Sequence, residues 1–343
     1  YYQANQHKKP TRYVTLLSIF GAMVFAGSLY GVIYLPIVVV MIVAMTAWGV
    51  YFEFFGFAQQ QYIAEIATPI QRPPVWAVLE MMRSIAYAIG PLLGAFLFQF
   101  GEKFVLWGAM GTLIIAYICF SFIRIKSRPI ELTAEHIDLK AEVRHWLALG
   151  TRVWPILIMS FVLILVDATF WSIGTMINDE LANLNQWGGF LMTTYMISSL
   201  IMGPLILRLK ISQHKKKWAQ IFMLMGGVTL ALFGIFHSVL WYLFITFVSS
   251  AMLALTWPLV DAVYTDLVVR LGRERQHLIG LCSSMNSLGY IVGPILAGGI
   301  AEVVGLYDTF VYLGIGIAVV SVLLIITTPR KLKLPQSEIE TWE

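Results

Sequence analysis

Residues 81–93 read MMRSIAYAIGPLL, and residues 284–296 read SMNSLGYIVGPIL. The two stretches share a methionine, a serine, a tyrosine, a Gly-Pro pair and a leucine in the same order and spacing. Each is an apolar helix pattern interrupted by Gly-Pro, which membrane helices tolerate better than soluble ones. Helical membrane proteins are often built from such internal repeats. The pair therefore predicts an all-α polytopic membrane protein with duplicated helix bundles.

The composition agrees with a chain that lies in a bilayer. Hydrophobic residues make up 59% of the sequence and charged residues only 12%, which leaves too little polar surface for a soluble domain. A span needs about 20 apolar residues to cross about 30 Å of hydrocarbon. The sequence contains ten such runs, near 13–33, 35–58, 75–99, 103–123, 153–177, 186–207, 218–237, 239–262, 278–301 and 306–327.

The basic residues predict the orientation of these spans, because cytoplasmic loops retain lysine and arginine. If the N-terminus is cytoplasmic, Lys103 is the one basic residue of 23 that falls on the outer side. An even number of spans then puts both termini in the cytoplasm, with the protein integral to the plasma (inner) membrane. The net charge of +4 reflects this topology and does not predict a nucleic-acid partner.

Motifs of soluble catalysis are missing from the sequence. Cys119 and Cys282 lie inside apolar spans and form neither a disulfide framework nor a metal-ligand spacing. The six histidines include no H-x-x-x-H pair, and the sequence has no P-loop and no G-x-S-x-G elbow. We therefore expect no enzymatic activity, no cofactor and no metal site.

The repeat extends beyond the Gly-Pro stretches. Residues 6–9 (QHKK) return as 213–216, and Phe104 returns as Phe310. Spans one to four therefore match spans seven to ten, whereas the fifth and sixth have no counterpart upstream. We expect the chain to be a fragment that lacks two front helices. The predicted domains are a four-helix bundle at 1–125, an amphipathic cytoplasmic linker at 126–151 and a six-helix bundle with a cytoplasmic tail at 152–343.

These patterns resemble the major facilitator superfamily. The Gly-Pro-x-x-Gly segment at 90–94 and its copy at 293–298 look like the fifth and eleventh helices of that family. Residues 203–208 (GPLILR) with the lysines at 215–217 are similar to its loop signature, although Leu207 stands where the family has an acid. By this resemblance the ten spans correspond to helices three to twelve of a twelve-helix fold.

The resemblance implies a secondary transporter that moves a small solute by alternating access. It also implies coupling to a proton or another cation, as a symporter or an antiporter, and we expect a monomer. Multidrug exporters are among the possible members. Two alternatives stay open: a receptor or scaffold that kept the fold without transport, and an intramembrane transferase, against which the lack of a second acidic cluster argues.

Asp167 is the first candidate for chemistry, because an ionisable side chain in hydrocarbon is costly unless it faces a cavity or a partner. Trp171 and Gly174 follow it by four and seven residues, which places all three on one helical face. We expect Asp167 to bind the substrate or the coupling proton. The alternative is an acid with a static packing role.

Glu53 is the second candidate, with Gly56 and Gln60 on its helical face. Many proton-coupled members of the family carry an arginine at this spacing, so the acid departs from the drug/proton antiporters. Desolvation favours the neutral form of a carboxyl group, which is the property that a proton carrier needs. The alternative is an ion pair with a helix absent from this chain.

Two further charged residues complete the candidate set. Arg83 lies about two turns inside its span, with Glu80 one turn before it, and the repeat has the neutral Asn286 in its place. It is either a gate or anion-binding charge, or an arginine that extends to the inner surface. Asp261, four residues after Trp257, belongs either to an inner gate or to a helix end near Arg270.

The remaining candidates are grouped by role. Several polar and aromatic residues are expected to line an amphipathic pocket, each with core packing as its alternative: Tyr51, Gln60, Trp171, Tyr195, Trp257 and Asn286. The Gly-Pro pairs Gly90-Pro91 and Gly293-Pro294 remove a helical hydrogen bond and are expected to let the helix bend. Close helix packing through the glycines is an equally good explanation.

Overall fold

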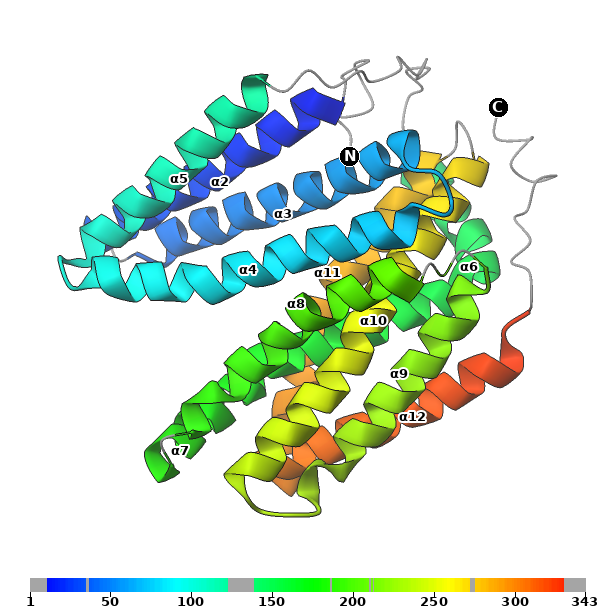
Figure 1. The fold of residues 1–343 in the computed structure, drawn as a ribbon. Coiled ribbons are helices and arrows are strands. Elements are labelled where there is room, and N and C mark those ends of the chain that lie inside the picture. Colours follow the sequence, from blue (N-terminus) through cyan, green and yellow to red (C-terminus); the bar gives the residue numbers. More distant parts are fainter. Residues whose placement is uncertain are drawn as a thin grey trace. The chain divides into compact units, whose positions relative to one another are not determined.

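The computed structural model describes residues 11–34, 37–122, 139–185, 187–209, 211, 213–271 and 275–329. All regular structure within these ranges is helical, as Figure 1 shows. The predicted all-α fold is therefore confirmed for this part of the chain.

The chain divides into two compact units. The first combines residues 1–66 with 89–142, and the second combines residues 67–88 with 143–343. The helices of the first unit are α2 (Thr11–Tyr34), α3 (Val38–Ile66), α5 (Glu102–Phe122) and the second part of α4 (Arg72–Phe98). The first part of α4, up to Ala88, belongs to the second unit, and the division falls next to the Gly-Pro pair.

The second unit contains the remaining helices. In chain order they are α6 (Leu139–Thr169), the π-helical turn η1 (Phe170–Gly174), α7 (Thr175–Leu184), the short 3-10 turn η2 (Gly188–Phe190), α8 (Leu191–Leu209), α9 (Lys215–Ala231), the 3-10 turn η3 (Leu232–Gly234), α10 (Val239–Leu271), α11 (Arg275–Val304) and α12 (Leu306–Thr327).

Long helices occupy all ten predicted spans. Within the described ranges, nine helical segments are long and apolar enough to cross a membrane, and α4 is the further helix that covers the predicted span at 75–99. The segment Val143–Leu184 counts as one span of 42 residues, because α6, η1 and α7 are continuous. Residues 139–151 of the expected linker are thus the first turns of α6, and residues 123–138 lie outside the described part.

The internal repeat is visible in the helix contacts. In the first unit α2 packs against α3 and α5, and in the second unit α9 packs against α10 and α12. These are the contacts expected if spans one to four correspond to spans seven to ten. The turns at Gly101 and Gly305 are also equivalent, since each joins the repeated Gly-Pro helix to the next helix with a positive φ, of 118° and 93°. Glycine adopts this conformation without steric cost.

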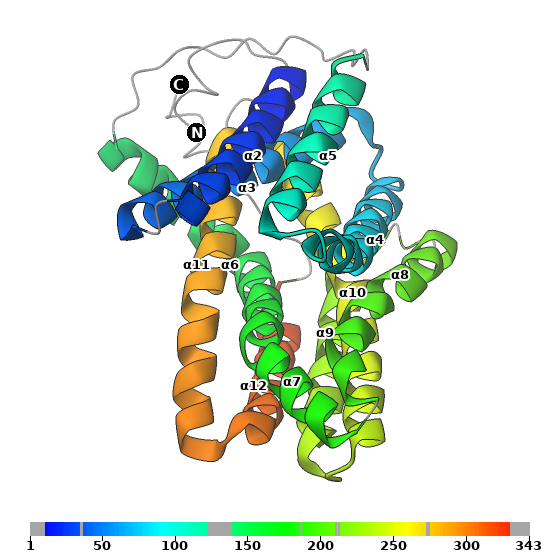
Figure 2. The same cartoon turned by 90° about the vertical axis from the view of Figure 1, so that its left-hand side faces the viewer.

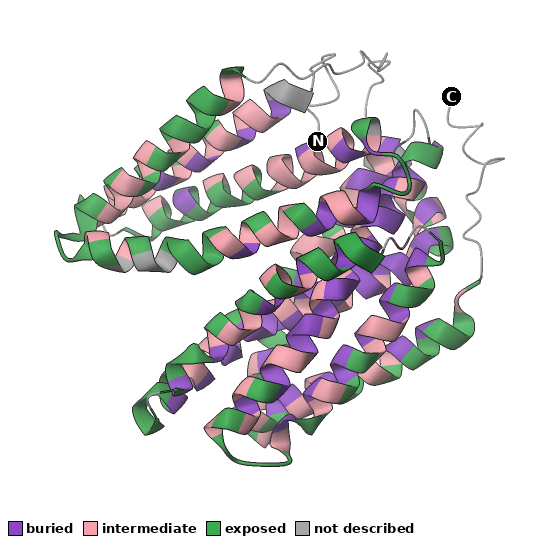
Figure 3. Cartoon of the chain, viewed as in Figure 1, coloured by how far each residue is buried: buried purple, intermediate pink, exposed green. Residues whose placement is uncertain are grey.

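The buried residues are concentrated in the second unit (Figure 3). The central helix α10 is buried along most of its length, which explains why it is apolar on all sides. In α5, by contrast, no described residue is buried. Large apolar side chains such as Trp107 and Phe122 are exposed there, as expected for a surface in contact with lipid.

Helices α6 and α11 lie side by side (Figure 2). Two glycines of α11 bring the two backbones close together. A Cβ atom at Gly293 would lie 2.7 Å from the Cβ of Ala168, and one at Gly289 would lie 2.7 Å from Cγ2 of Ile164. Neither distance is compatible with ordinary van der Waals contact. Small residues are what allow membrane helices to pack at short range.

The substitution Gly293→Ala should therefore destabilise the protein. The added methyl group overpacks the α6–α11 interface, at a cost of about 1–3 kcal/mol. Gly298→Ala on the same helix is the matched control, because no atom lies within 4 Å of a Cβ built there. Thermal unfolding in detergent measures both variants. Equal melting temperatures for the two would contradict the close packing described here.

Candidate functional site

Asp167 lies near the end of α6 and is held by two tyrosines from other helices. The hydroxyl of Tyr195 on α8 donates to its Oδ1 atom at 2.6 Å. The hydroxyl of Tyr290 on α11 donates to Oδ2 at 2.7 Å. Phe170 stacks on Tyr195 with ring centroids 4.1 Å apart, which fixes the orientation of that ring. Three helices thus converge on one carboxylate.

The π-helical turn Phe170–Gly174 begins three residues after Asp167. π-helical turns are rare in proteins, and those that occur are often found at functional sites. The extra residue in the turn changes the direction of the side chains that follow. A Cβ at Gly174 would lie 3.2 Å from Cδ1 of Phe170 and 3.4 Å from the sulfur of Met192. The turn displays Trp171 on the surface of the unit, with 42% of the side chain exposed.

Helix α4 contributes an ion pair to the same region. Nη1 of Arg83 donates to Oε1 of Glu80 at 2.8 Å. The Glu80 side chain is mostly buried, with a relative exposure of 15%, and that of Arg83 is 40%. The charge of Arg83 acts on Asp167 and on Asp261 of α10, and Glu80 acts on both as well. The guanidinium of Arg83 therefore lies within electrostatic range of three carboxyl groups.

The two repeated tyrosines flank α6. Tyr87 of α4 meets Trp171 edge to face, with ring centroids 5.7 Å apart. Tyr290 is its counterpart in α11 and donates a hydrogen bond to Asp167. Asp167 lies one turn before Trp171. The exposed fractions are 45% for Tyr87 and 37% for Tyr290, so both rings present surface outside the core. Tyr87 of the first repeat copy thus contacts Trp171, and Tyr290 of the second copy contacts Asp167.

Other predicted residues lie nearby on the same unit. Asn286 of α11 accepts a hydrogen bond from the hydroxyl of Ser160 on α6, at 3.0 Å. Trp257 lies one turn before Asp261 on α10, and both are partly buried. Asp261 lies in electrostatic range of Glu80 and Arg83 on α4. Its role in an inner gate stays a prediction.

Glu53, Tyr51 and Gln60 lie on α3 in the first unit and are all partly buried. The ring of Tyr51 stacks on that of Phe55 at 5.8 Å. A Cβ built at Gly21 of α2 would lie 3.6 Å from the Cα and Cβ atoms of Tyr51, so Tyr51 is at a close contact between α2 and α3. Its packing role is therefore visible. The coupling role of Glu53 stays a prediction.

The residues predicted to bend helices differ between the two copies. Gly293 packs against α6, and Pro294 lies inside α11 without ending it. Gly90 has no atom within 4 Å of a built Cβ, and the side chain of Pro91 lies outside the described part of the structure. Close packing thus accounts for Gly293. Bending stays a prediction for both pairs.

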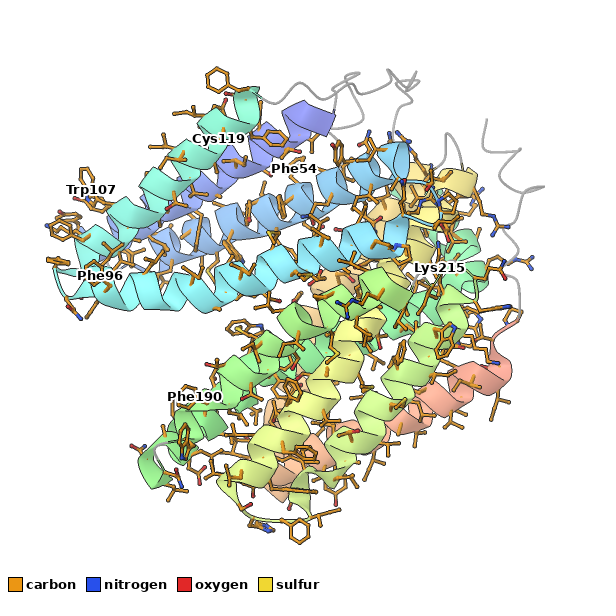
Figure 4. All side chains as sticks on the ribbon, in the orientation of Figure 1. Phe54, Phe96, Trp107, Cys119, Phe190 and Lys215 are labelled. Atoms are coloured by element: carbon orange, nitrogen blue, oxygen red, sulfur yellow. The ribbon has the colours of Figure 1, made fainter. Side chains whose placement is uncertain are left out.

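A second charged cluster joins the start of α4 to α9 and α10. Nη1 of Arg72 donates to Oδ1 of Asp266, and Nζ of Lys215 donates to Oδ2 of the same carboxylate at 2.7 Å. Lys215 also donates to the carbonyl oxygen of Pro69, at 2.7 Å. The side chains of Arg72 and Lys215 are each only 5% exposed. Figure 4 labels Lys215 at the start of α9.

This cluster was not predicted from the sequence, although the basic residues were. Arg72 and Asp266 are 194 positions apart, and no spacing rule connects them. A hydrogen bond of 3.0 Å from Nε1 of Trp76 to the hydroxyl of Thr265 continues the same contact between α4 and α10. The role of Tyr87 and Tyr290 was also missed. Their recurrence in the repeat was the signal that could have revealed it.

Comparison with known families gives a match over almost the entire chain. The family model described as the Major Facilitator Superfamily matches residues 9–234 and 156–342. A curated relative, Multidrug resistance protein 2 of Bacillus subtilis (strain 168), is 22% identical over 276 residues, which cover 78% of this chain and 67% of the relative.

Several solved structures share the fold. The human organic anion transporter MFSD10 superposes with a TM-score of 0.72 at 15% identity, covering 92% of this chain and 77% of that one. The Escherichia coli fucose:proton symporter FucP gives 0.70 at 10% identity, with 94% and 84% covered. A bacterial homologue of the iron transporter ferroportin, in an outward-facing state, gives 0.66 at 15% identity, with 95% and 84% covered.

The substitution Asp266→Asn should destabilise the second unit. It leaves Arg72 and Lys215 buried without a counter-charge, and removing one partner of a buried ion pair costs about 3–5 kcal/mol. We expect a loss of about 2 kcal/mol, because the Asp266 side chain is 30% exposed and partly screened. Unfolding in detergent is the measurement.

The exposed residue Asp179 of α7 gives the control variant, Asp179→Asn. Replacing the three charged residues together, with Arg72→Met, Lys215→Met and Asp266→Leu, should recover stability, since no unpaired charge is left. If Asp266→Asn unfolds at the temperature of the control, the cluster contributes no stability.

Proposed function

Because this chain belongs to the Major Facilitator Superfamily of secondary transporters, we propose that it moves a small solute across the membrane by alternating access, with the Asp167 cluster as the site of binding and coupling. The observation that supports this proposal is the carboxylate of Asp167, which lies in a membrane-spanning helix and accepts hydrogen bonds from Tyr195 and Tyr290. Such an intramembrane acid is a functional candidate by default.

The cluster has the properties needed for coupling. Protonation of Asp167 removes one negative charge from a group of three carboxyls and one guanidinium. The two tyrosine hydroxyls can donate to the ionised form, while the neutral form no longer interacts with the charge of Arg83. Occupancy by a proton therefore changes the interaction energy of α6 with α4, α8 and α11. A difference of a few kcal/mol is enough to shift the populations of two access states.

We assign the second coupling role to Glu53 of α3. It lies in the other unit and is partly buried in α3, where residues 38–58 are otherwise apolar except for Thr46. An acid at such a position is costly to keep unless it takes part in binding or proton transfer. Asp167 and Glu53 would then provide one titratable group in each unit.

The name of one similar protein supports coupling to a proton, and the names together leave the substrate open. FucP is a fucose:proton symporter, MFSD10 an organic anion transporter, and the curated relative a multidrug resistance protein. We propose proton coupling for this chain. We also propose a plasma (inner) membrane location, a monomer, and cytoplasmic termini as the positive-inside pattern indicates.

The substitution Asp167→Asn should abolish uphill transport, because the amide keeps the size of the side chain and cannot carry a proton. Glu53→Gln should do the same. Proteoliposomes with an imposed pH gradient and an internal pH dye would be tested against a panel of sugars, organic cations and organic anions. The wild-type protein should discharge the gradient with at least one solute, and both variants should fail to do so.

Asp179→Asn on the same continuous α6–α7 helix is the control and should transport normally. Gradient discharge that is unchanged in both Asp167→Asn and Glu53→Gln would overturn the coupling mechanism. Binding of a solute without flux in the wild-type protein would instead favour a receptor or scaffold that retains the fold.

A further inference from the structure

A hollow of about 360 Å³ lies between α2 and α5, inside the first unit. Its walls are mostly apolar, and three small residues keep the space open: Ala26, Gly27 and Gly111. A Cβ built at Gly111 has no atom within 4 Å, and one at Gly27 meets the end of the Met110 side chain at 3.9 Å. We call this hollow the α2–α5 groove.

The second copy of the repeat fills the corresponding place with its own side chains. Counted from the repeated QHKK and FV-x-x-G segments, Ala26 corresponds to Phe233, and Gly111 corresponds to Ile317. Phe233 packs against Phe310 of α12 with ring centroids 5.2 Å apart, and Ile317 lies against α9. Both residues are buried, with exposed fractions of 0% and 2%. The groove is thus a difference between the two copies and not a property of the repeat itself.

The end of the groove near the start of α5 carries a positive charge. Lys103 is the one basic residue that the positive-inside pattern places on the outer side, and its Nζ atom lies 4.9 Å from the ring centroid of Tyr34. The hydroxyl of Tyr34 is 3.1 Å from that of Tyr30, which lines the groove. Within the described ranges no carboxylate lies within 4.0 Å of the Lys103 ammonium, that of the adjacent Glu102 included.

The length of the groove matches one lipid leaflet. Ile114, which lines its inner part, follows Lys103 by eleven residues, or about 16 Å along the helix axis. Half of the hydrocarbon core of a bilayer is about 15 Å thick. Trp107, labelled on α5 in Figure 4, is 67% exposed and meets Tyr30 at 6.5 Å. Tryptophan, tyrosine and lysine in this arrangement are typical of the depth at which lipid head groups lie.

We propose that the α2–α5 groove binds an anionic phospholipid of the leaflet that faces away from the cytoplasm. One acyl chain lies along Gly27 and Gly111, and the phosphate lies beside Lys103. The ammonium supplies a counter-charge, and the hydroxyls of Tyr30 and Tyr34 can donate to phosphate oxygens. A zwitterionic lipid carries its own cation and gains less from the lysine. The site uses none of the proposed coupling residues, so it does not rest on the proposed transport.

The test uses the purified protein in phosphatidylcholine vesicles that contain a minor fraction of a phospholipid with brominated acyl chains. Bromine quenches tryptophan fluorescence on contact, and the signal of Trp107 is the difference between the wild-type protein and Trp107→Phe. We expect brominated phosphatidylglycerol to quench this signal at an about fivefold lower mole fraction than brominated phosphatidylcholine, since one lysine near a membrane surface contributes an attraction of this size.

Substitutions of Lys103 test the assignment of the head group. Lys103→Met should remove the preference for phosphatidylglycerol, and Lys103→Arg should keep it, because the charge is retained. Lys217→Met replaces an exposed lysine of α9 and is the matched control, which should quench like the wild-type protein. A preference that is unchanged in Lys103→Met would overturn the assignment of the phosphate to this residue.

Substitutions on α5 test the acyl-chain part of the groove. Gly111→Leu fills the open space without a clash and should reduce quenching by phosphatidylglycerol to the level of phosphatidylcholine, with no fall in the melting temperature. Ala109→Leu, at an exposed position of α5 outside the groove, should behave like the wild-type protein. Quenching in Gly111→Leu that equals that of Ala109→Leu would show that the chain lies elsewhere and would overturn the proposal.

The wild-type protein alone distinguishes the other occupants of the groove. Equal quenching of Trp107 by the two brominated lipids would show that the groove accepts acyl chains without regard to the head group, and the proposal would be wrong. An absence of quenching by either lipid would show that a protein segment or a second copy of the chain covers the groove, which would also overturn it.

Discussion

The carboxylate of Asp167 inside a membrane helix is the constraint on which the second unit depends. Placing an aspartate at the centre of a membrane helix costs about 3 kcal/mol on insertion scales. The structure offsets this cost with two hydroxyl donors from helices distant in sequence, Tyr195 on α8 and Tyr290 on α11. Both helices must therefore pack within side-chain reach of α6. The arrangement of the surrounding helices follows from that requirement.

The glycines of α11 explain how Tyr290 reaches the acid. Gly289 and Gly293 are one turn apart and face α6, where a larger residue would meet Ile164 or Ala168 at 2.7 Å. Because the two backbones approach this closely, the tyrosine next to Gly289 can span the interface with its hydroxyl. Gly289 thus allows the close packing, and the adjacent Tyr290 donates the hydrogen bond to Asp167. The Gly-Pro repeat indicates a duplicated fold, and its second copy, residues 284–296, also contributes Tyr290 to the site around Asp167.

The sequence predicted the fold well, because apolar length and repetition are local signals that need no knowledge of contacts. It also selected Asp167, Trp171, Tyr195 and Arg83 as candidates, since ionisable and aromatic residues are conspicuous in apolar spans, and their roles stay predictions. It could not predict the π-helical turn at Phe170, which has no sequence signature, or the pairing of Arg72 and Lys215 with Asp266, which depends on long-range topology. The coupling role of Glu53 stays a prediction.

The two copies of the repeat have diverged in a way that suits a single site. At the position where α4 carries Arg83, paired with Glu80, α11 carries Asn286, which accepts from Ser160. At the tyrosine position the copies are identical in residue, yet Tyr87 contacts Trp171 while Tyr290 donates to Asp167. Only one copy carries an arginine here, and that arginine is paired with Glu80, whereas Asp167 accepts hydrogen bonds from two tyrosines. This asymmetry is consistent with the proposed coupling at Asp167.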